Sequence, residues 1–321
     1  MGEIMRYLVI LIAAFVALSC GTAQAREVAL VIANSMYDPQ RDPLENPNLR
    51  NAANDAKLIA ASLKDAGFEE VVVAINLSTD DFHRNLTKFA NLADGADTAV
   101  IYFAGHGVRH KGTNWLIPTG VHLTNAKDLP FEAIQLELLL DALSGAKLRV
   151  AAIDACRNSA AELGSDDEDG LQSGLAGSQV KNALLIFAAA PGEFALDSVG
   201  GSIHSPFATS LSSQLSKMTR LHDIGGNIAE DVAKATGAMQ TPVAMVGMGS
   251  KNAFLTTEQY QQAMAAMEDS APTDRMVSLM QDKEVWKEAK ADGSKEALEI
   301  YLEMFPDGMF RKFAELEIKR L

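Results

Sequence analysis

Short apolar segments rich in β-branched residues alternate with amphipathic segments of helical period over most of the chain, and this alternation constrains the fold more than any other feature. Near-continuous apolar strands separated by helices are typical of a mostly parallel sheet that is covered on both faces. The pattern therefore predicts an α/β fold, a three-layer sandwich around a sheet of about six strands. Strands are expected at residues 28–32, 70–74, 98–103, 148–154, 183–189 and 243–246, and helices at 54–66, 80–92, 135–143, 207–215 and 224–236.

The first residues have the features of a secretory signal peptide. Arg6 precedes an apolar run from Tyr7 to Leu18, and Ala23-Gln24-Ala25 forms a small-x-small cleavage site. The run is about a dozen residues long, whereas a membrane-spanning helix needs roughly 20. We therefore expect a signal peptide over residues 1–25 and a mature protein that is exported, periplasmic or secreted, and that retains no membrane span.

The two cysteines of the chain raise separate questions. Cys20 opens the alternative of a lipoprotein, although the residues before it, Ala17-Leu18-Ser19, fit the usual small-residue lipoprotein motif poorly. Removal of residues 1–25 leaves Cys156 alone, so it has no partner for an internal disulfide. A leftover cysteine in an exported protein indicates a partner chain or a reactive thiol, and a buried inert thiol is the alternative.

The composition excludes some classes of function. The net charge is −14, and an acidic chain is a poor ligand for nucleic acid or for an anionic membrane. No GxGxxG or GxxxxGK[ST] pattern follows an expected strand, which argues against a nucleotide-dependent enzyme.

Two polar loops follow expected strands. His106 lies between two glycines after the strand at 98–103, and Cys156 follows the strand at 148–154. In open α/β sheets, ligands bind beyond the carboxyl ends of the strands. If these two strands are neighbours, His106 and Cys156 leave the sheet side by side. A lone histidine in a loop is more often solvated or capping, but a cysteine in the corresponding place favours a catalytic pair.

The residue types suit acyl transfer. A thiol of ordinary pKa is mostly protonated at neutral pH, so a nearby imidazole is needed to take its proton and later to protonate the leaving amine. Glycines beside His106 let the backbone approach a substrate closely. The amides of Gly107 and Cys156 are therefore candidates for an oxyanion hole.

From about Val28 to Leu255 the chain resembles the caspase-like clan of cysteine peptidases, family C14, closest to bacterial caspase-like proteins and paracaspases. In caspases the histidine precedes the cysteine by about 50 residues, as His106 precedes Cys156. The resemblance implies a caspase-like fold and a cysteine endopeptidase that acts on polypeptides without a cofactor. Its other landmarks are Leu30-Val31-Ile32-Ala33-Asn34, Asn54-Asp55-Ala56, Gly112-Thr113-Asn114-Trp115-Leu116-Ile117-Pro118, Ala190-Pro191-Gly192-Glu193 and Ser205-Pro206-Phe207.

The residues around the cysteine depart from those of true caspases, which carry a glutamine two residues before it and a glycine two residues after it. This chain has Asp154 and Asn158 there, which looks like the metacaspase and paracaspase side of the clan. That resemblance places Asp154 and Asp55 at the bottom of the pocket for the residue before the scissile bond (S1), with Glu193 as a looser third match. Carboxylates there imply cleavage after arginine or lysine.

Simpler roles compete with this assignment. In the alternative, Asp154 only forms hydrogen bonds with nearby backbone groups. Likewise, Asn54, which precedes Asp55, is then simply a helix N-cap. A second function also stays open, a catalytically weak caspase-like protein that binds or regulates partners. Since such proteins typically lose the histidine or the cysteine, the presence of His106 and Cys156 favours an active peptidase.

A Gly/Ser-rich stretch at 160–179 contains the acidic run 166–169. Some members of the clan that the chain resembles are stimulated by calcium, but the spacing fits no ordered calcium loop. We therefore expect a solvated acidic loop and no metal site. If cleavage follows basic residues, Lys181 is the best candidate for self-processing in the loop 160–181, because a segment of this kind can reach an active site.

The composition changes after Leu255. The expected domains are a peptidase domain at 26–256, a linker at 257–273 and a helical hairpin at 274–321. The hairpin is predicted from apolar residues at helical spacing on both sides of the turn Pro306-Asp307-Gly308, and it is similar to tetratricopeptide-like tails of bacterial caspase-like proteins. Its apolar stripe packs internally or binds a protein partner.

Overall fold

The computed structural model describes the chain in several segments and divides it into two compact units after Gln261. For residues 158–159, 267–269 and 274–280 it describes the backbone alone. Among the described residues, no helix has both the length and the hydropathy that crossing a membrane requires. The described segments are residues 25–37, 49–155, 158–159, 182–190, 193–217, 219–247, 253–269 and 274–321.

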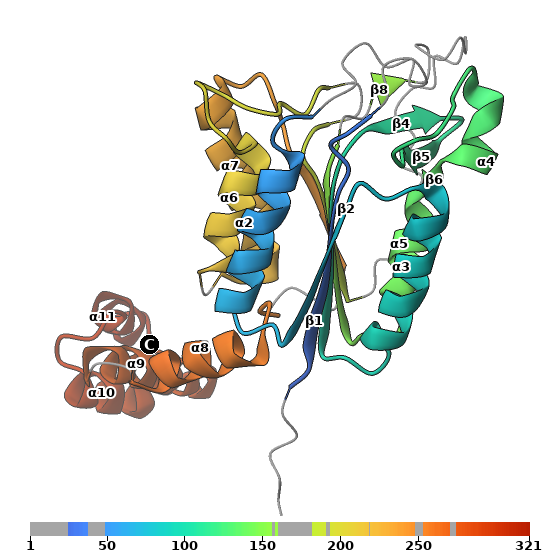
Figure 1. Ribbon diagram of the computed structural model, residues 1–321. Coiled ribbons are helices and arrows are strands. Elements are labelled where there is room, and N and C mark those ends of the chain that lie inside the picture. The colour runs from blue at the N-terminus through green and yellow to red at the C-terminus, as the bar shows by residue number, and fades with distance from the viewer. Residues whose placement is uncertain are drawn as a thin grey trace, which may run out of the picture. The chain divides into compact units, whose positions relative to one another are not determined.

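The first unit is built on a six-stranded sheet with the order β10-β9-β7-β3-β1-β2 (Figure 1). All neighbouring strands are parallel except β9 and β10. Every residue of β1 and β3 is buried, which explains why these segments are apolar without alternation. The prediction of a mostly parallel sheet of about six strands is confirmed. The strands are β1 (Glu27–Ala33), β2 (Glu70–Ile75), β3 (Thr98–Ala104), β7 (Leu148–Asp154), β9 (Ala183–Phe187) and β10 (Val243–Val246).

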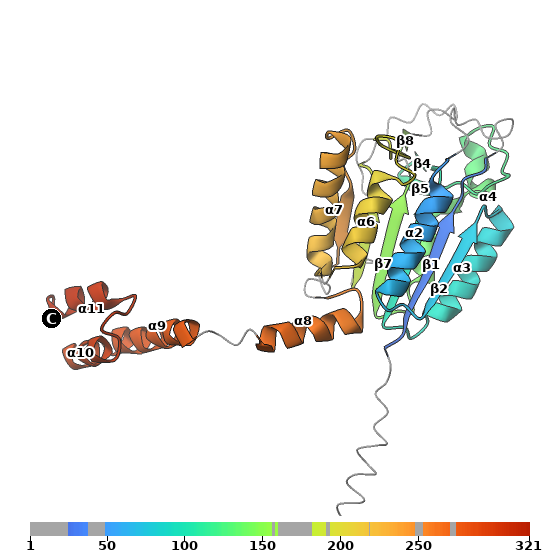
Figure 2. The ribbon, with the colours of Figure 1, turned by 60° about the vertical axis from the view of Figure 1, so that its left-hand side comes forward.

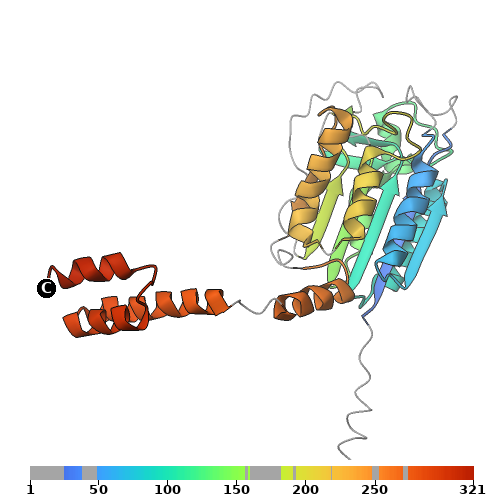
Figure 3. The same cartoon turned by 90° about the vertical axis from the view of Figure 1, so that its left-hand side faces the viewer.

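Helices cover both faces of the sheet (Figure 1), and the turned views look onto one of the two helical layers (Figures 2 and 3). Successive side chains along each strand point to opposite faces of the sheet and pack in two separate hydrophobic cores. Tyr102 belongs to one core and Phe103 to the other. The chain therefore forms the predicted three-layer α/β sandwich. One layer contains α2 (Ala52–Asp65), α6 (Pro206–Leu215) and α7 (Leu221–Thr236), and the other contains α3 (Thr79–Ala93) and α5 (Leu136–Ala142).

A second, four-stranded sheet lies beyond the carboxyl ends of the main strands (Figure 1). Its order is β6-β5-β4-β8. Lys111 and Gly112 both have positive φ in the tight turn between β4 and β5, as such hairpins require. The elements are β4 (Gly107–His110), β5 (Thr113–Leu116), β6 (Ile134–Gln135) and β8 (Asn158–Ser159), with the short helices η1 (Ala126–Asp128) and α4 (Leu129–Glu132) between β5 and β6.

The start of α2 differs from the expectation. The N-cap residue is Asn51, and its side chain makes no capping bond within the helix. Instead, its amide Nδ2 donates to the carbonyl oxygens of Asp197 at 2.8 Å and Ser202 at 3.3 Å. Asn54 is inside the helix, so the interpretation of Asn54 as the N-cap was wrong. The helix start is instead tied to a loop far away in the sequence.

The second unit contains α9 (Asp274–Asp292), α10 (Lys295–Met304) and α11 (Arg311–Ile318). Its own small core includes Trp286 and Tyr301. The hydroxyl of Tyr301 donates to Asp282 Oδ1 at 2.6 Å, and this carboxylate also accepts the Met309 amide at 2.6 Å. Residues 274–321 thus form three helices where a hairpin of two was expected. The expected linker 257–273 is largely occupied by another helix, α8 (Thr257–Asp269).

Candidate functional site

A cavity opens at the carboxyl ends of β3 and β7, with a volume of about 330 Å³ including its mouth. Its walls come from both strand ends, from the start of α2 and from the segment that precedes α6. The register pairs Ala104 of β3 with Asp154 of β7, so the two strands end side by side. The described lining residues are Leu49, Ala52, Asp55, Ala104, Gly105, His106, Asp154, Ala155, Ala195, Leu196, Asp197 and Ser205.

His106 lies in the wall of this cavity, with 8% of its surface exposed. Its backbone amide donates to the hydroxyl of Tyr37 at 2.9 Å, and the two rings are 4.4 Å apart. Its carbonyl accepts the amide of Ile117 at 2.9 Å. Tyr37 Oη in turn donates to the Ile117 carbonyl at 3.1 Å. These contacts hold the histidine at the end of β3.

Gly105, the residue before this histidine, has no room for a side chain. A Cβ atom would lie 2.6 Å from the ring of Phe103 and 2.8 Å from Tyr37 Oη. The Gly105 amide donates to the carbonyl of Asp154 at 3.2 Å, which links the two strand ends. Glycine is therefore required here by close packing.

Asp154 is 8% exposed and lies at the end of β7. Its Oδ2 accepts the hydroxyls of Tyr102 at 2.9 Å and Ser205 at 2.7 Å. Both donors are side chains of other elements, which does not fit the alternative that Asp154 only bonds local backbone. Burial raises the pKa of the Asp154 carboxyl to about 7, and the charge of Asp55 acts in the same direction.

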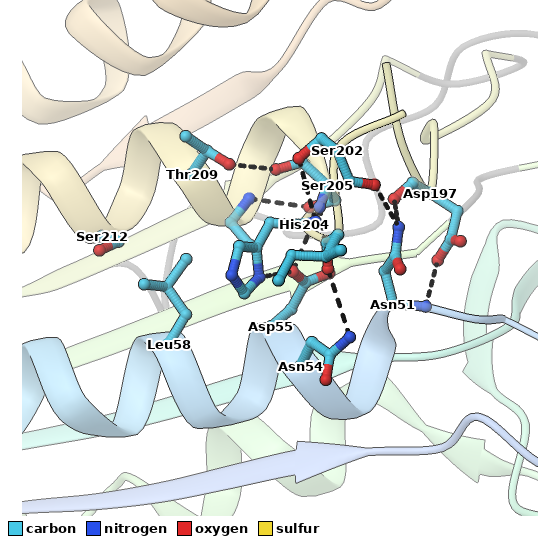
Figure 4. A network of polar contacts seen from close by, with 12 residues as sticks. Asn51, Asn54, Asp55, Leu58, Asp197, Ser202, His204, Ser205, Thr209 and Ser212 are labelled. Carbon is cyan, nitrogen blue, oxygen red and sulfur yellow. Dashed lines mark hydrogen bonds and ion pairs between the residues drawn. The ribbon is translucent and has the colours of Figure 1, made fainter. Parts of the chain in front are cut away.

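Asp55 is 2% exposed and lies in the first turn of α2 (Figure 4). Its Oδ1 is 2.9 Å from Nδ1 of His204, and the Ser205 amide donates to Oδ1 at 3.2 Å and to Oδ2 at 3.3 Å. Burial raises the pKa of Asp55 to about 7; the Ser205 amide opposes this shift, and the charge of Asp197 adds to it. The structure therefore brings Asp55 and Asp154 to one cavity.

Asp197 adds a third carboxylate that the sequence analysis missed. It lines the cavity, and its Oδ1 accepts the amide of Asn51 at 3.2 Å. Glu193 is absent from the described lining; its carboxylate instead accepts the Thr241 amide at 2.9 Å. Asp197 belongs to a segment without periodic pattern. The sequence pointed to this residue only through its position, four residues after Glu193.

The cavity concentrates negative charge. Among the described residues that line it there is no lysine or arginine. The described hydrogen bonds to the Asp154 carboxyl group, from Tyr102 and Ser205, both end on Oδ2. Repulsion among the carboxylates raises their proton affinity, and a cation would relieve this repulsion. Two carboxylates in one pocket match the several N–H donors of a guanidinium group.

The other predicted site residues stand in different relations to the cavity. Gly107 opens β4 and pairs with Leu116 of β5. Cys156 lies outside the described residues, as do the acidic loop and Lys181. Ala155, which is bonded directly to Cys156, lines the cavity together with His106. In the described part of the chain, no group of three or more acidic, histidine or cysteine side chains is arranged to hold a metal ion.

Comparisons with known proteins agree with this architecture. A family model described as the caspase domain, Peptidase C14, matches residues 26–254, which include the main sheet and every residue named in the cavity wall. The chain is also similar to the crystal structure of the Drosophila initiator caspase Dronc, with 16% identity, a TM-score of 0.50, and coverage of 71% of this chain and 82% of that chain. This likeness shows the shared fold.

A second similar structure is caspase-1 from Spodoptera frugiperda, with 16% identity, a TM-score of 0.49, and coverage of 70% of this chain and 87% of that chain. No curated protein matches the sequence.

Proposed function

Because the chain belongs to the caspase-domain family of peptidases, Peptidase C14, we propose that it is a cysteine endopeptidase that cleaves polypeptides after arginine or lysine. The observation that carries the proposal is the cavity itself. It combines His106, two buried carboxyl groups and Ala155, the residue bonded to Cys156. Cys156 follows Ala155 directly in the sequence, and the proposal takes its thiol as the nucleophile.

The proposed chemistry follows the Cys–His pattern. His106 takes the proton of the Cys156 thiol, and the thiolate attacks the carbonyl carbon of the scissile bond. The amides of Gly107 and Cys156 stabilise the oxyanion that forms. His106 then donates the proton to the leaving amine, which departs as the acyl-enzyme forms. Water hydrolyses the acyl-enzyme with the same imidazole as base.

Specificity is assigned to the acidic end of the cavity. A guanidinium there would bind Asp154 through Oδ1 and approach Asp55 and Asp197, and it would remove the mutual repulsion of these groups. An aspartate side chain would add a further negative charge. A preference for a basic side chain fits the resemblance to metacaspases and paracaspases, since this chain has Asp154 where true caspases have a glutamine.

The decisive experiment compares peptides that differ only in the residue before the scissile bond. Peptides ending in Arg should exceed those ending in Asp by at least about 30-fold in kcat/KM, since an unpaired buried charge costs on the order of 2 kcal/mol or more. Asp154→Ala should erase this difference. Cys156→Ala and His106→Ala should each abolish hydrolysis, and the double variant should lose no more.

Other outcomes would change the assignment. Undiminished hydrolysis by Cys156→Ala would refute the catalytic pair. Hydrolysis with a preference for Asp would overturn only the specificity. A folded protein without turnover on any peptide would support the catalytically weak, partner-binding function instead.

Two further parts of the proposal concern maturation. We propose that the signal peptide is cleaved after Ala25 and that the mature protein is exported to the periplasm or the cell exterior. We also propose that the protein cleaves itself after Lys181. Mass spectrometry of the protein from the periplasm or culture medium should find a chain that begins at Arg26. Prolonged incubation of the active protein should cut after Lys181, whereas Cys156→Ala should stay intact.

A further inference from the structure

His204 lines a second cavity and contacts a residue of the acidic cavity. On one side, its Nδ1 is 2.9 Å from Oδ1 of Asp55, which lines the acidic cavity (Figure 4). On the other side, His204 lines a cavity of about 760 Å³, including its mouth, that is bordered by α6 and α7. The side chain of His204 is 25% exposed, whereas that of Asp55 is 2% exposed. The imidazole therefore connects a solvent-accessible group with a buried carboxyl group.

The loop that carries His204 is held in place from several sides. The His204 amide donates to Ser202 Oγ at 3.1 Å, and the Ser202 carbonyl accepts Nδ2 of Asn51 at 3.3 Å. The next residue, Ser205, donates its amide to Asp55 and its hydroxyl to Asp154. The imidazole consequently meets Asp55 in a defined orientation.

The direction of the bond between His204 and Asp55 follows from chemistry. An ionised carboxylate has only acceptor oxygens, so the hydrogen in this bond belongs to Nδ1 of His204 whenever Asp55 is charged. A donor to the charged form of a carboxyl group favours that form. Burial and the charges of Asp154 and Asp197 favour the neutral form instead. Among the described residues that line the second cavity together with His204, the charged one is Asp231.

We propose that His204 is a positioning residue of the acidic cavity, whose Nδ1–H favours the ionised form of Asp55, orients its carboxyl group and thereby sets the selectivity for a charged over a neutral side chain before the scissile bond. This inference rests on the proposed function and deepens it. It adds a residue that does not itself line the acidic cavity.

Three variants separate this role from a packing role. His204→Asn places an amide nitrogen near the position of Nδ1, His204→Gln places one near Nε2, and His204→Leu offers no donor. The readout is the ratio of kcat/KM for an arginyl peptide to kcat/KM for the matching citrullyl peptide. Citrulline has nearly the shape of arginine without its charge, so the ratio cancels the titration of the catalytic pair.

At about pH 6.5, His204→Leu should lower this ratio roughly tenfold, because loss of a hydrogen bond to a charged group moves the titration of that group by about one pH unit. At about pH 9 the ratio should return to that of the wild type, since Asp55 is then ionised without the donor. His204→Asn should retain the ratio of the wild type, and His204→Gln should behave as His204→Leu.

A ratio for His204→Leu equal to that of the wild type at every pH would overturn the inference. So would a loss that persists at about pH 9, or rescue by Gln as complete as rescue by Asn. Binding of benzamidine, a small amidinium probe, to the same variants in a Cys156→Ala background gives a readout without catalysis. If no peptide is cleaved but benzamidine binding follows the predicted pH shift, the endopeptidase proposal fails while the role of His204 stands. If benzamidine binds no variant at any pH, the role of His204 fails as well.

Discussion

Burial of the Asp55 and Asp154 carboxyl groups makes their ionisation unfavourable in the folded protein. The pKa of both Asp55 and Asp154 is raised to about 7, whereas an aspartate in an unfolded chain has a pKa of about 4. Between about pH 4 and pH 7 the folded state therefore binds more protons than the unfolded state, and stability falls as the pH rises. The contribution is greatest below about pH 4 and is lost as the pH rises through about 7. Burial is the main cause of the raised pKa values, and repulsion between the carboxyl groups adds to it. A cationic side chain in the cavity would relieve that repulsion.

Asp154→Asn should remove part of this pH dependence. The amide oxygen can still accept the hydroxyls of Tyr102 and Ser205, but it carries no charge. Between about pH 5 and pH 8, the free energy of unfolding of the wild type should fall by roughly 2 to 3 kcal/mol more than that of the variant. Urea unfolding at both pH values measures this difference. Parallel pH dependence in the two proteins would show that Asp154 is ionised throughout this range.

At the scale of elements, the site depends on how β3 passes into β4. Gly105 joins the two strands where the ring of Phe103 and the hydroxyl of Tyr37 leave no space for a Cβ atom. The same hydroxyl accepts the amide of His106. Packing of this loop and the position of the His106 imidazole are thus coupled through the side chain of Tyr37.

Gly105→Ala should therefore reduce both the stability of the fold and the rate of peptide hydrolysis. Overpacking costs about 1 to 3 kcal/mol, and the displaced tyrosine would move His106, for which a shift of about 1 Å can lower the rate about 100-fold. Gly226→Ala in α7 is the control, because a Cβ there meets nothing within 4 Å. That variant should unfold at the same or slightly higher urea concentration and hydrolyse peptides at the wild-type rate. Full activity of Gly105→Ala would disprove the coupling.

At the scale of the whole molecule, the chain divides into two units with separate cores. In the second unit, Trp286 stacks on Phe310 with ring centroids 5.5 Å apart and meets Tyr301 at 5.4 Å. Nothing in the candidate site depends on these residues, since every described lining residue of the cavity belongs to the first unit. The two units should therefore unfold separately.

Trp286→Ala tests this independence. Truncation of a buried tryptophan costs about 3 to 5 kcal/mol, so calorimetry should show one transition shifted to lower temperature and the other unchanged. Peptide hydrolysis should be unaffected. A single transition that moves as a whole, or a parallel loss of activity, would show that the two units are coupled.

The helices and strands of the main sheet could be predicted because each is long enough to show a period or a continuous apolar run. The small sheet could not, since β6 and β8 contain two residues each and β4 and β5 four each. The helix α8 was also missed, because its polar sequence lacks a clear apolar stripe and was interpreted as part of a linker.

For the site, the sequence by itself determined that His106 and Asp154 each follow or end a strand of a mostly parallel sheet, and parallel strands end at one edge. The structure then showed that the two strands are neighbours. Only the tertiary structure decided which groups of the 193–205 segment join them. This segment has no periodic pattern, and hydrogen bonds to Asn51 and Asp55, nearly 150 residues earlier, determine its place. Those long-range hydrogen bonds bring Asp197 rather than Glu193 to the cavity and place His204 in contact with Asp55.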